Sequence, residues 1–263
     1  MLYILVCILT VLFILMLNTN FIRKSVYSLI CNLPSEITIM HLSDIHGRTR
    51  FLNGKLSSLI IEVNPDVIFI TGDLTTTPRQ VNSIIQELMV IQERGIPTYF
   101  VHGNYEREYR RNFKKHLYTA DEFQKRTNQL SKHMTILENE GQKVTINGVS
   151  LYVYGFDNSF YGNEQNLSEE NGDSDFTCYL AHSPSIISYV TENGLDFNLL
   201  LAGHTHGGQI QLFNKMIGPY KHFHVGLKKL KDKQYFYITT GIGTVRIPLR
   251  VNSNPEIAIF KVK

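Results

Sequence analysis

The sequence predicts an α/β protein built around a buried sheet, with an apolar helix at its N-terminus. Two observations lead to the α/β prediction. Strand-like segments alternate with amphipathic helical ones from residue 37 onward, and the strand-like segments are almost continuously apolar. The helix is predicted by residues 2–17, LYILVCILTVLFILML, which contain no charge, glycine or proline. In a sheet of this kind the active site gathers at the C-terminal ends of the strands.

The apolar N-terminal segment is long enough to anchor the chain in a membrane. Phe21 and Ile22 extend it to about the 20 residues that a span requires. It lacks both the basic start and the small-residue cleavage site of a secretory signal. We therefore expect residues 1–22 to remain as a single-pass transmembrane helix, with the lipid bilayer as its partner.

The rest of the chain is expected to form a short connector and one domain. Arg23 and Lys24 follow the apolar segment directly, so the positive-inside rule places the domain in the cytoplasm. Residues 23–36 are expected to be a juxtamembrane linker. The alternating pattern then runs through residues 37–263, which we expect to fold as the catalytic domain.

Each expected element follows from its own pattern. Apolar runs that end in polar residues predict strands, apolar residues three and four apart predict helices, and Asn147-Gly148 predicts a hairpin turn. The charged segment 106–132 is expected to be helical, and the polar segment 157–175 to be an exposed loop. The expected strands lie within 37–47, 66–76, 97–106, 141–157, 175–184, 197–208, 234–243 and 256–263, and the other expected helices within 56–63, 81–95 and 185–194.

Composition indicates an ordinary globular protein. A net charge of +3 over 263 residues is too small to indicate a nucleic-acid partner, and we expect none. The three cysteines, Cys7, Cys31 and Cys178, match neither a disulfide framework nor a CxxC metal site. Nothing in the composition therefore requires an oxidising compartment.

Residues with metal-binding side chains follow five of the expected strands. Taken singly, each one has an ordinary interpretation as a turn residue or a buried histidine. Their ordered recurrence at strand ends predicts instead that they meet at one edge of a sheet. The seven residues are Asp44, His46, Asp73, Asn104, His182, His204 and His206.

Such a group of side chains favours divalent transition metals. Asp44 and Asp73 would repel each other unless a cation lay between them. Imidazoles combined with carboxylates suit Mn, Fe or Zn better than Ca or Mg. Seven donors, with one carboxylate shared, fit two ions about 3.5–4 Å apart, which could convert a shared water into hydroxide for attack on phosphorus.

The motif series resembles that of a known superfamily. DxH, GD, GN, H and GHxH, in this order, resemble the calcineurin-like metallophosphoesterase superfamily, and the resemblance covers nearly all of 37–263. GHTHGGQ at 203–209, GIGT at 241–244, the Pro-x-Arg that ends at Arg250 and PEI at 255–257 resemble more narrowly a bacterial, membrane-anchored branch related to UDP-2,3-diacylglucosamine hydrolases. The resemblance implies a two-sheet β-sandwich flanked by helices, in four αββα layers, around a dinuclear metal centre.

The resemblance also assigns the seven residues to two metal sites that share Asp73. One site would take Asp44, His46, Asp73 and His206, and the other Asp73, Asn104, His182 and His204.

One position departs from the family pattern. The family usually has His after GN, where it contacts the phosphate and can protonate the leaving group, and this chain has Tyr105. A phenol is protonated at neutral pH and donates a hydrogen bond, but it transfers protons less readily than imidazole. We expect Asn104 and Tyr105 to act in catalysis, with Tyr105 contacting the substrate and Glu106 in support. The alternative is a non-catalytic, metal-binding membrane scaffold that lost the catalytic His.

The predicted function is a membrane-anchored phosphoesterase that cleaves a phosphodiester or pyrophosphate bond. A lipid-linked nucleotide-sugar pyrophosphate is the first candidate substrate, and a soluble phosphomonoester or cyclic nucleotide is the second. Arg246 is expected to bind the substrate; for it and Arg250, phosphate contact and structural ion pairing remain alternatives. Residues 221–233, with five lysines and two histidines, form either a solvated basic face or a contact with anionic headgroups.

Overall fold

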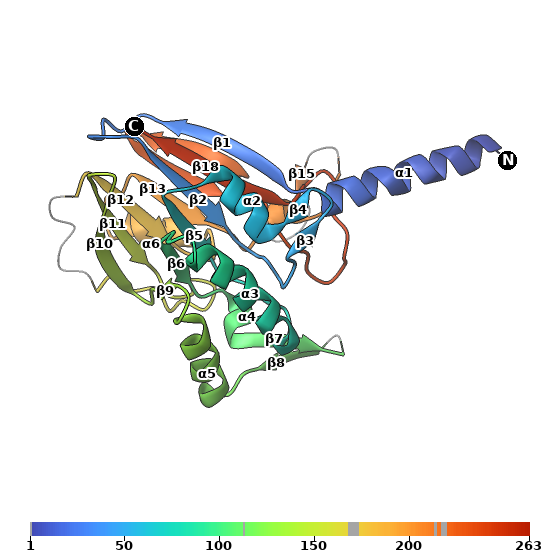
Figure 1. The fold of residues 1–263 in the computed structure, drawn as a ribbon, viewed down its shortest axis with the longest axis horizontal. Helices are drawn as coiled ribbons and strands as arrows, with labels where there is room; N and C mark the ends of the chain where they lie inside the picture. The colour runs from blue at the N-terminus through green and yellow to red at the C-terminus, as the bar shows by residue number, and fades with distance from the viewer. Residues whose placement is uncertain (1, 113, 168–173, 213–214, 217–219) are drawn as a thin grey trace.

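Two six-stranded sheets form the centre of the computed structural model, which describes residues 2–112, 114–167, 174–212, 215–216 and 220–263 (Figure 1). In order across the first sheet lie β1 (Arg23–Leu29), β18 (Glu256–Val262), β2 (Ile37–Leu42), β5 (Val67–Thr71), β6 (Thr98–Val101) and β9 (Thr135–Ile136). Across the second lie β10 (Glu140–Ile146), β11 (Val149–Gly155), β12 (Phe176–Leu180), β13 (Leu199–Ala202), β17 (Gln234–Ile238) and β16 (Gly226–Lys231).

The two sheets and their helices make four layers. Apolar side chains from both sheets, such as Phe69 and Leu201, form one core between them. A second core joins the outer face of the first sheet to α2 (Leu56–Val63) and α3 (Val81–Gln92). A third joins the outer face of the second sheet to α6 (Ile186–Glu192). The predicted αββα sandwich is thereby confirmed.

Each sheet has a parallel centre whose strands end on the same side. In the first sheet β2, β5 and β6 pair in parallel, and in the second β11, β12, β13 and β17 do so. Nearly all residues of these strands are buried, which explains their continuous apolar pattern. The loops that follow the strands carry the candidate site.

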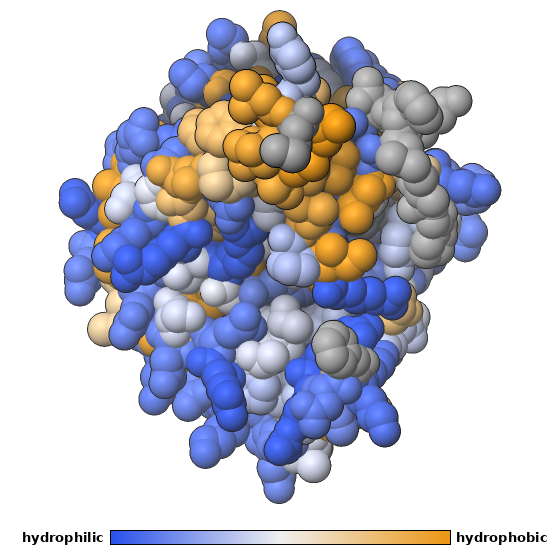
Figure 2. Space-filling view, turned by 90° about the vertical axis from the view of Figure 1, so that its right-hand side faces the viewer, coloured by the Kyte–Doolittle hydropathy of each residue, from blue (hydrophilic) through white to orange (hydrophobic). Residues whose placement is uncertain are grey.

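The N-terminal helix α1 (Leu2–Asn20) projects from the sandwich (Figure 1). It is long and apolar enough to cross a membrane, and its side chains are exposed over most of its length. Figure 2 views the molecule from the side on which α1 projects, and apolar surface gathers in the region where the helix points toward the viewer, while most of the remaining face is hydrophilic.

The segment expected to be a linker starts instead as a strand. Residues Arg23–Leu29 form β1, which pairs in parallel with β18. Ile22 and Leu29 are fully buried in the cores on the two sides of the first sheet. The folded domain therefore begins close to the end of α1.

Two other segments differ from expectation. Among the described residues of the charged segment, α4 (Asn104–Arg107) and α5 (Ala120–Leu130) are helical, and an antiparallel hairpin lies between them. The predicted exposed loop begins with buried residues 157–159, while residues 168–173 lie outside the described residues. The hairpin at Asn147-Gly148 is confirmed. The remaining short strands are β3 (Arg50–Phe51), β4 (Gly54–Lys55), β7 (Glu108–Arg111), β8 (Lys114–Leu117), β14 (Gln211–Leu212) and β15 (Lys215–Met216).

Candidate metal centre

The fold brings the seven predicted residues together between the C-terminal ends of the two sheets. Loops after β2, β5 and β6 supply one side, and loops after β12 and β13 supply the other. Two groups of potential ligand atoms result, each with all its atoms within 4.8 Å of one another. They are Asp44, His46 and His206, and Asp73, His182 and His204.

The backbone at the candidate site is strained. Five of the seven residues have a positive φ, between 49° and 68°, a region that residues other than glycine seldom adopt. Such conformations persist only where the surrounding structure enforces them, and they concentrate at functional sites. The five are Asp44, His46, Asp73, His204 and His206.

The first group consists of Asp44, His46 and His206. The Nε2 atoms of the two histidines lie 3.2 Å apart, and His206 Nε2 lies 3.3 Å from Asp44 Oδ1. His46 Nδ1 lies 3.0 Å from the Thr76 hydroxyl. If that nitrogen donates its proton to Thr76, the Nε2 lone pair is directed into the group.

The second group consists of Asp73, His182 and His204, with Asn104 beside it. His182 Nε2 lies 3.0 Å from His204 Nδ1 and 3.2 Å from Asn104 Oδ1. His182 Nδ1 donates to the Thr71 carbonyl at 2.7 Å, so Nε2 is the ring nitrogen that faces the group. The Asn104 amide nitrogen donates to Glu108, so the amide oxygen is the atom that faces the group.

Asp73 lies between the two groups. Its Oδ2 is 3.4 Å from His182 Nε2 and 3.7 Å from His46 Nε2. Its Oδ1 accepts a hydrogen bond from the Tyr105 amide at 2.8 Å, which fixes the carboxylate plane. This is the position that a carboxylate shared by two ions would require.

The two buried carboxylates and His182 shift one another's pKa values. Burial raises the pKa of Asp44 to about 6, with His182 opposing the shift and Asp73 reinforcing it. Burial alone would lower the pKa of His182, but Asp73 and Asp44 outweigh it and raise that pKa to about 10. Burial likewise disfavours charge on Asp73, yet His182 lowers the pKa of Asp73 below its usual value.

The buried carboxylates of the site are therefore better neutralised by bound metal cations than by protonation. Asp44 Oδ2 accepts hydrogen bonds from the Ser43 hydroxyl and the His204 amide, but Asp44 Oδ1 is buried and accepts none from any described residue. A buried carboxylate oxygen without a donor is costly unless a cation meets it. Histidine nitrogens with carboxylate and amide oxygens are a donor set for divalent transition metals.

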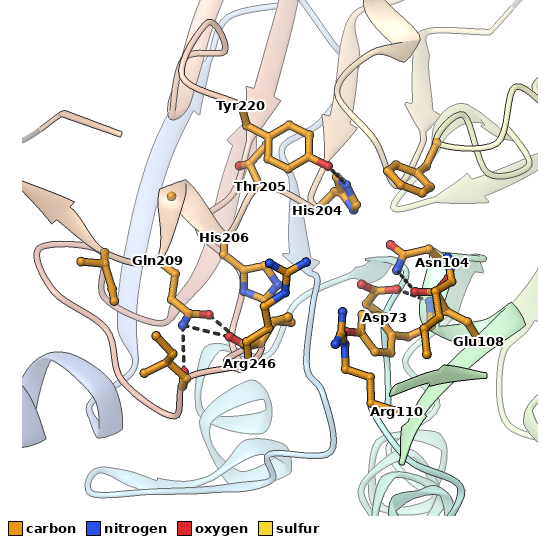
Figure 3. A pocket seen from close by; sticks show the side chains of 17 residues that line it. Asp73, Asn104, Glu108, Arg110, His204, Thr205, His206, Gln209, Tyr220 and Arg246 are labelled. Atoms are coloured by element: carbon orange, nitrogen blue, oxygen red, sulfur yellow. Dashed lines mark hydrogen bonds and ion pairs between the residues drawn. The ribbon is translucent and has the colours of Figure 1, made fainter. Parts of the chain in front are cut away.

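A pocket of about 630 Å³ opens beside the two groups (Figure 3). Asp73, Asn104, His204 and His206 reach its wall, and its other residues include three cations and several apolar side chains. The cations are Arg110, Lys115 and Arg246. An anionic ligand could thus contact the candidate metal ligands and positive charge together.

Tyr105 occupies the position where the family usually has His. Its ring packs edge-on against His46, with centroids 4.9 Å apart, and its hydroxyl accepts a hydrogen bond from Arg110 Nε at 2.9 Å. Burial raises the pKa of Tyr105, while Arg110 opposes that shift. The hydroxyl is therefore protonated at neutral pH and can donate to a ligand in the pocket.

Glu106 supports the site, as the sequence indicated. Its buried carboxylate accepts hydrogen bonds from the amides of Asp73, Leu74 and Gly103 at 2.7–2.9 Å. These bonds join the loop after β5 to the loop after β6. Because Asp73 and Asn104 lie on these two loops, Glu106 fixes the spacing between them.

The sequence did not indicate two residues of the site, Tyr220 and Arg110, and it left the roles of two arginines, Arg246 and Arg250, open. Tyr220, whose hydroxyl lies 2.6 Å from His204 Nε2, gave no recognisable motif. Arg110, beside Tyr105, lies in a segment that was expected to be helical. Arg246 is exposed and lines the pocket, whereas Arg250 is fully buried and bonds to backbone carbonyls, so phosphate contact does not apply to Arg250.

Comparisons with known proteins agree with this geometry. A family model described as calcineurin-like phosphoesterase matches residues 37–208. An uncharacterized metallophosphoesterase of Campylobacter jejuni is 31% identical over 91% of this chain and 63% of its own length. An uncharacterized protein of Bacillus subtilis, YpbG, is 30% identical over 85% of this chain and 80% of its own length. A bovine transmembrane protein with a metallophosphoesterase domain is 28% identical over 85% of this chain and 52% of its own.

The family match covers most of the chain and includes all seven residues of the candidate site, from Asp44 to His206. Together with the two groups of potential ligands, it implies divalent metal ions as cofactors. The chain belongs to the calcineurin-like phosphoesterase family, and it is a metal-dependent hydrolase of phosphoester bonds.

Proposed function

We propose that this protein is a membrane-anchored, dinuclear-metal phosphoesterase whose substrate is a phosphodiester or pyrophosphate carried by a lipid. The observation that supports it most is the pocket in which two groups of potential metal ligands meet three cationic side chains. Bound in these groups, two divalent ions of Mn, Fe or Zn would supply Lewis-acid charge for phosphate and activate water for attack.

The residues of the chain have separate roles in this proposal. Asp73 would be shared by both ions, and Asn104 would present its amide oxygen to one of them. Tyr105 donates a hydrogen bond to a phosphate oxygen, and Arg110 and Arg246 balance its negative charge. These contacts orient the phosphorus centre toward the metal pair.

Tyr105 favours substrates whose leaving group needs no proton. Its hydroxyl is protonated at neutral pH and is a weaker proton shuttle than imidazole. A phosphate released from a pyrophosphate is stable as an anion, whereas an alkoxide from a simple alkyl phosphomonoester requires protonation. The proposal therefore ranks pyrophosphates, including lipid-linked nucleotide sugars as in UDP-2,3-diacylglucosamine hydrolases, above alkyl phosphomonoesters.

The anchor supports a substrate in the membrane. The helix α1 is long and apolar enough to span, and the bovine relative is named as a transmembrane protein. Apolar side chains of Phe160, Ile210 and Ile247 line the pocket together with the cations. A pocket of this mixed character suits an amphiphilic phosphate. Arg23 and Lys24 further support placing the domain on the cytoplasmic side.

Hydrolysis assays test the proposal. The full-length protein in detergent should hydrolyse bis-p-nitrophenyl phosphate with added Mn²⁺ and lose this activity in EDTA. Its kcat/KM for a nucleoside diphosphate-linked lipid should be at least tenfold higher than for p-nitrophenyl phosphate. Arg246→Met should raise KM for the lipid about tenfold with kcat little changed, whereas Lys228→Met on exposed β16 should alter neither.

Two results would contradict the proposal. A lipid pyrophosphate cleaved no better than p-nitrophenyl phosphate would remove the substrate assignment. No hydrolysis of any probe, with activity appearing in Tyr105→His, would favour the scaffold that lost its catalytic His.

A further inference from the structure

The last turn of α1 is docked on the domain through hydrogen bonds. Arg48 donates to the Thr19 carbonyl at 2.9 Å and to the Asn20 side chain at 2.7 Å, and the Leu52 amide donates to the Asn20 carbonyl at 2.8 Å. Cationic groups at a helix C-terminus stabilise it, because they meet the unpaired carbonyls there. Thr19 is 4% exposed, unlike the exposed residues earlier in α1.

Thr19 also holds the backbone of Arg250. The Thr19 hydroxyl donates to the Leu15 carbonyl at 2.7 Å and accepts from the Arg250 amide at 2.9 Å. Both functions of the hydroxyl are therefore satisfied, one within the helix and one in the domain. This contact joins α1 to the Pro-x-Arg motif near the other end of the chain.

The Arg250 side chain in turn holds a candidate metal ligand. Its guanidinium is fully buried, with Nη2 3.2 Å from His206 Nδ1 and Nη1 3.4 Å from the His206 carbonyl. It also donates to the Gly243 carbonyl at 2.9 Å and to the Ser253 carbonyl at 3.0 Å. Three loop segments thus meet on one planar group, and the bond to the His206 carbonyl fixes the backbone that carries this residue.

Both connections from α1 reach the same group of potential ligands. Arg250 contacts His206, and Arg48, which binds the helix end, lies two residues after His46. Among the described residues, the contacts that link the end of α1 to the candidate ligands reach the group of Asp44, His46 and His206. The Asp73 group is supported by Glu106 and Tyr220 instead. The anchor is therefore coupled to one side of the candidate centre.

We infer that the last turn of α1 is part of the structural support of the metal centre, with Thr19 and Arg250 as positioning residues for His206. The inference rests on the metal centre of the proposed function. A simple tether would need a flexible connection, but only Phe21 and Ile22 separate α1 from β1, and Ile22 is buried. Loss of the helix end would weaken metal binding in the folded domain as well as release it from the membrane.

Co²⁺ binding to the full-length protein in detergent micelles tests this inference. Affinity is measured by competition with a chromophoric chelator, and ligand geometry by the visible absorption of bound Co²⁺. Thr19→Val removes the hydroxyl at nearly constant volume. It should weaken one of two Co²⁺ binding steps about fivefold and change the absorption of bound Co²⁺. Groups that touch a metal ligand directly affect affinity by about 10- to 100-fold, and Thr19 acts one step further away, through Arg250.

Two variants serve as controls for Thr19→Val. Thr19→Ser keeps the hydroxyl and should bind Co²⁺ like the wild-type protein. Thr10→Val removes a hydroxyl of the same helix that bonds only to the Val6 carbonyl in the described contacts, and it should also leave Co²⁺ binding unchanged. Arg250→Met should weaken the same step by about 10- to 100-fold.

The outcomes separate this inference from the proposed function. Wild-type Co²⁺ affinities in Thr19→Val, or equal losses in Thr10→Val, would overturn the positioning role and leave the phosphoesterase proposal standing. A wild-type protein that binds no Co²⁺ would overturn both. Because Arg250→Met removes a buried side chain and can impair folding, Thr19→Val decides the question, with urea unfolding as a check that it is folded.

Discussion

At the scale of single residues, Asp73 lies where the two groups of potential metal ligands meet. One carboxylate oxygen is held by the Tyr105 amide, and the other lies within 3.7 Å of histidines from both groups. Asp73→Asn keeps the shape but halves the acceptor capacity and removes the charge. We expect hydrolytic activity to fall at least 100-fold and bound metal to fall from two ions toward one or none, as measured by elemental analysis.

Asp66 provides the matched control for this prediction. Its carboxylate also accepts a backbone hydrogen bond, from the Thr38 amide at 2.7 Å, but Asp66 lies directly before β5, at the opposite end of the strand from the site. Asp66→Asn should retain activity and metal content. Full activity in Asp73→Asn would exclude Asp73 as a shared ligand.

His41 illustrates a buried histidine that serves the fold. It is fully buried on β2, its Nε2 lies 2.7 Å from the Thr71 hydroxyl, and burial lowers its pKa to about 3. The neutral ring is thus favoured in the folded state, so stability is complete above the unfolded pKa of about 6.5 and is lost as pH falls below it.

The His41 contribution predicts a measurable pH dependence. When pH is lowered from 7.5 to 5.5, the free energy of unfolding should decrease by about 1.4 kcal/mol more in the wild-type protein than in His41→Gln, because the glutamine side chain does not titrate. Urea unfolding in EDTA measures this difference without contributions from metal release. An identical pH dependence in the wild-type protein and in His41→Gln would contradict the prediction.

At the scale of elements, the sequence predicted those strands whose pattern depends only on their own residues and their immediate neighbours. The central strands are apolar throughout because both faces are buried, and the polar residues that follow them converge because parallel strands end on one side. β1 was missed because RKSVYSL is polar on its exposed face and pairs with β18, at the other end of the chain. The hairpin of β7 and β8 was missed for a related reason: charged residues alone do not separate helix from edge strand.

The same distinction holds within the candidate site. Asp44, His46, His204 and the other predicted residues stand in short motifs beside strands, so their positions follow from local sequence. Tyr220 and Arg250 acquire their contacts only when separate loops pack together, and no spacing in the sequence specifies that packing.

The unexpected strand β1 gives a prediction at this scale. Leu29 on β1 is fully buried in the core between the sheets, whereas Val26 on the same strand is 57% exposed. Leu29→Ala should reduce the free energy of unfolding by about 3 kcal/mol, and Val26→Ala by less than about 0.5 kcal/mol. Denaturant unfolding measures both. Equal, small effects would mean that residues 23–29 act as a connector, as the sequence alone suggested.

At the scale of the whole molecule, the structure joins an apolar helix to a folded domain with almost no connecting chain. The helix leaves the domain on a face that is mostly hydrophilic away from the helix (Figure 2). Because Thr19 and Asn20 are bonded to the domain, the helix has a defined direction relative to the pocket. We propose that this arrangement holds the catalytic domain against one membrane surface.

Partial deletion of the helix tests the anchor separately from the centre that it supports. Removing residues 2–14 leaves Thr19 and its partners in place but leaves too few apolar residues to span a bilayer, which needs about 20. The shortened protein should move from the membrane to the soluble fraction with Co²⁺ binding intact, whereas removal of residues 1–22 should release it with weakened binding. Continued membrane retention after both deletions would show that another surface holds the protein there.

A reporter fused after Lys263 determines the side of the membrane. Lys263 is exposed and follows β18, which runs antiparallel to β2 and therefore ends on the side of the first sheet opposite the site, so a fusion there leaves the site free. Arg23 and Lys24 directly after the span predict a cytoplasmic domain, and a fluorescent protein that matures only in the cytoplasm should therefore fluoresce. Activity of a fused phosphatase that requires export would place the domain outside and would remove cytoplasmic substrates from consideration.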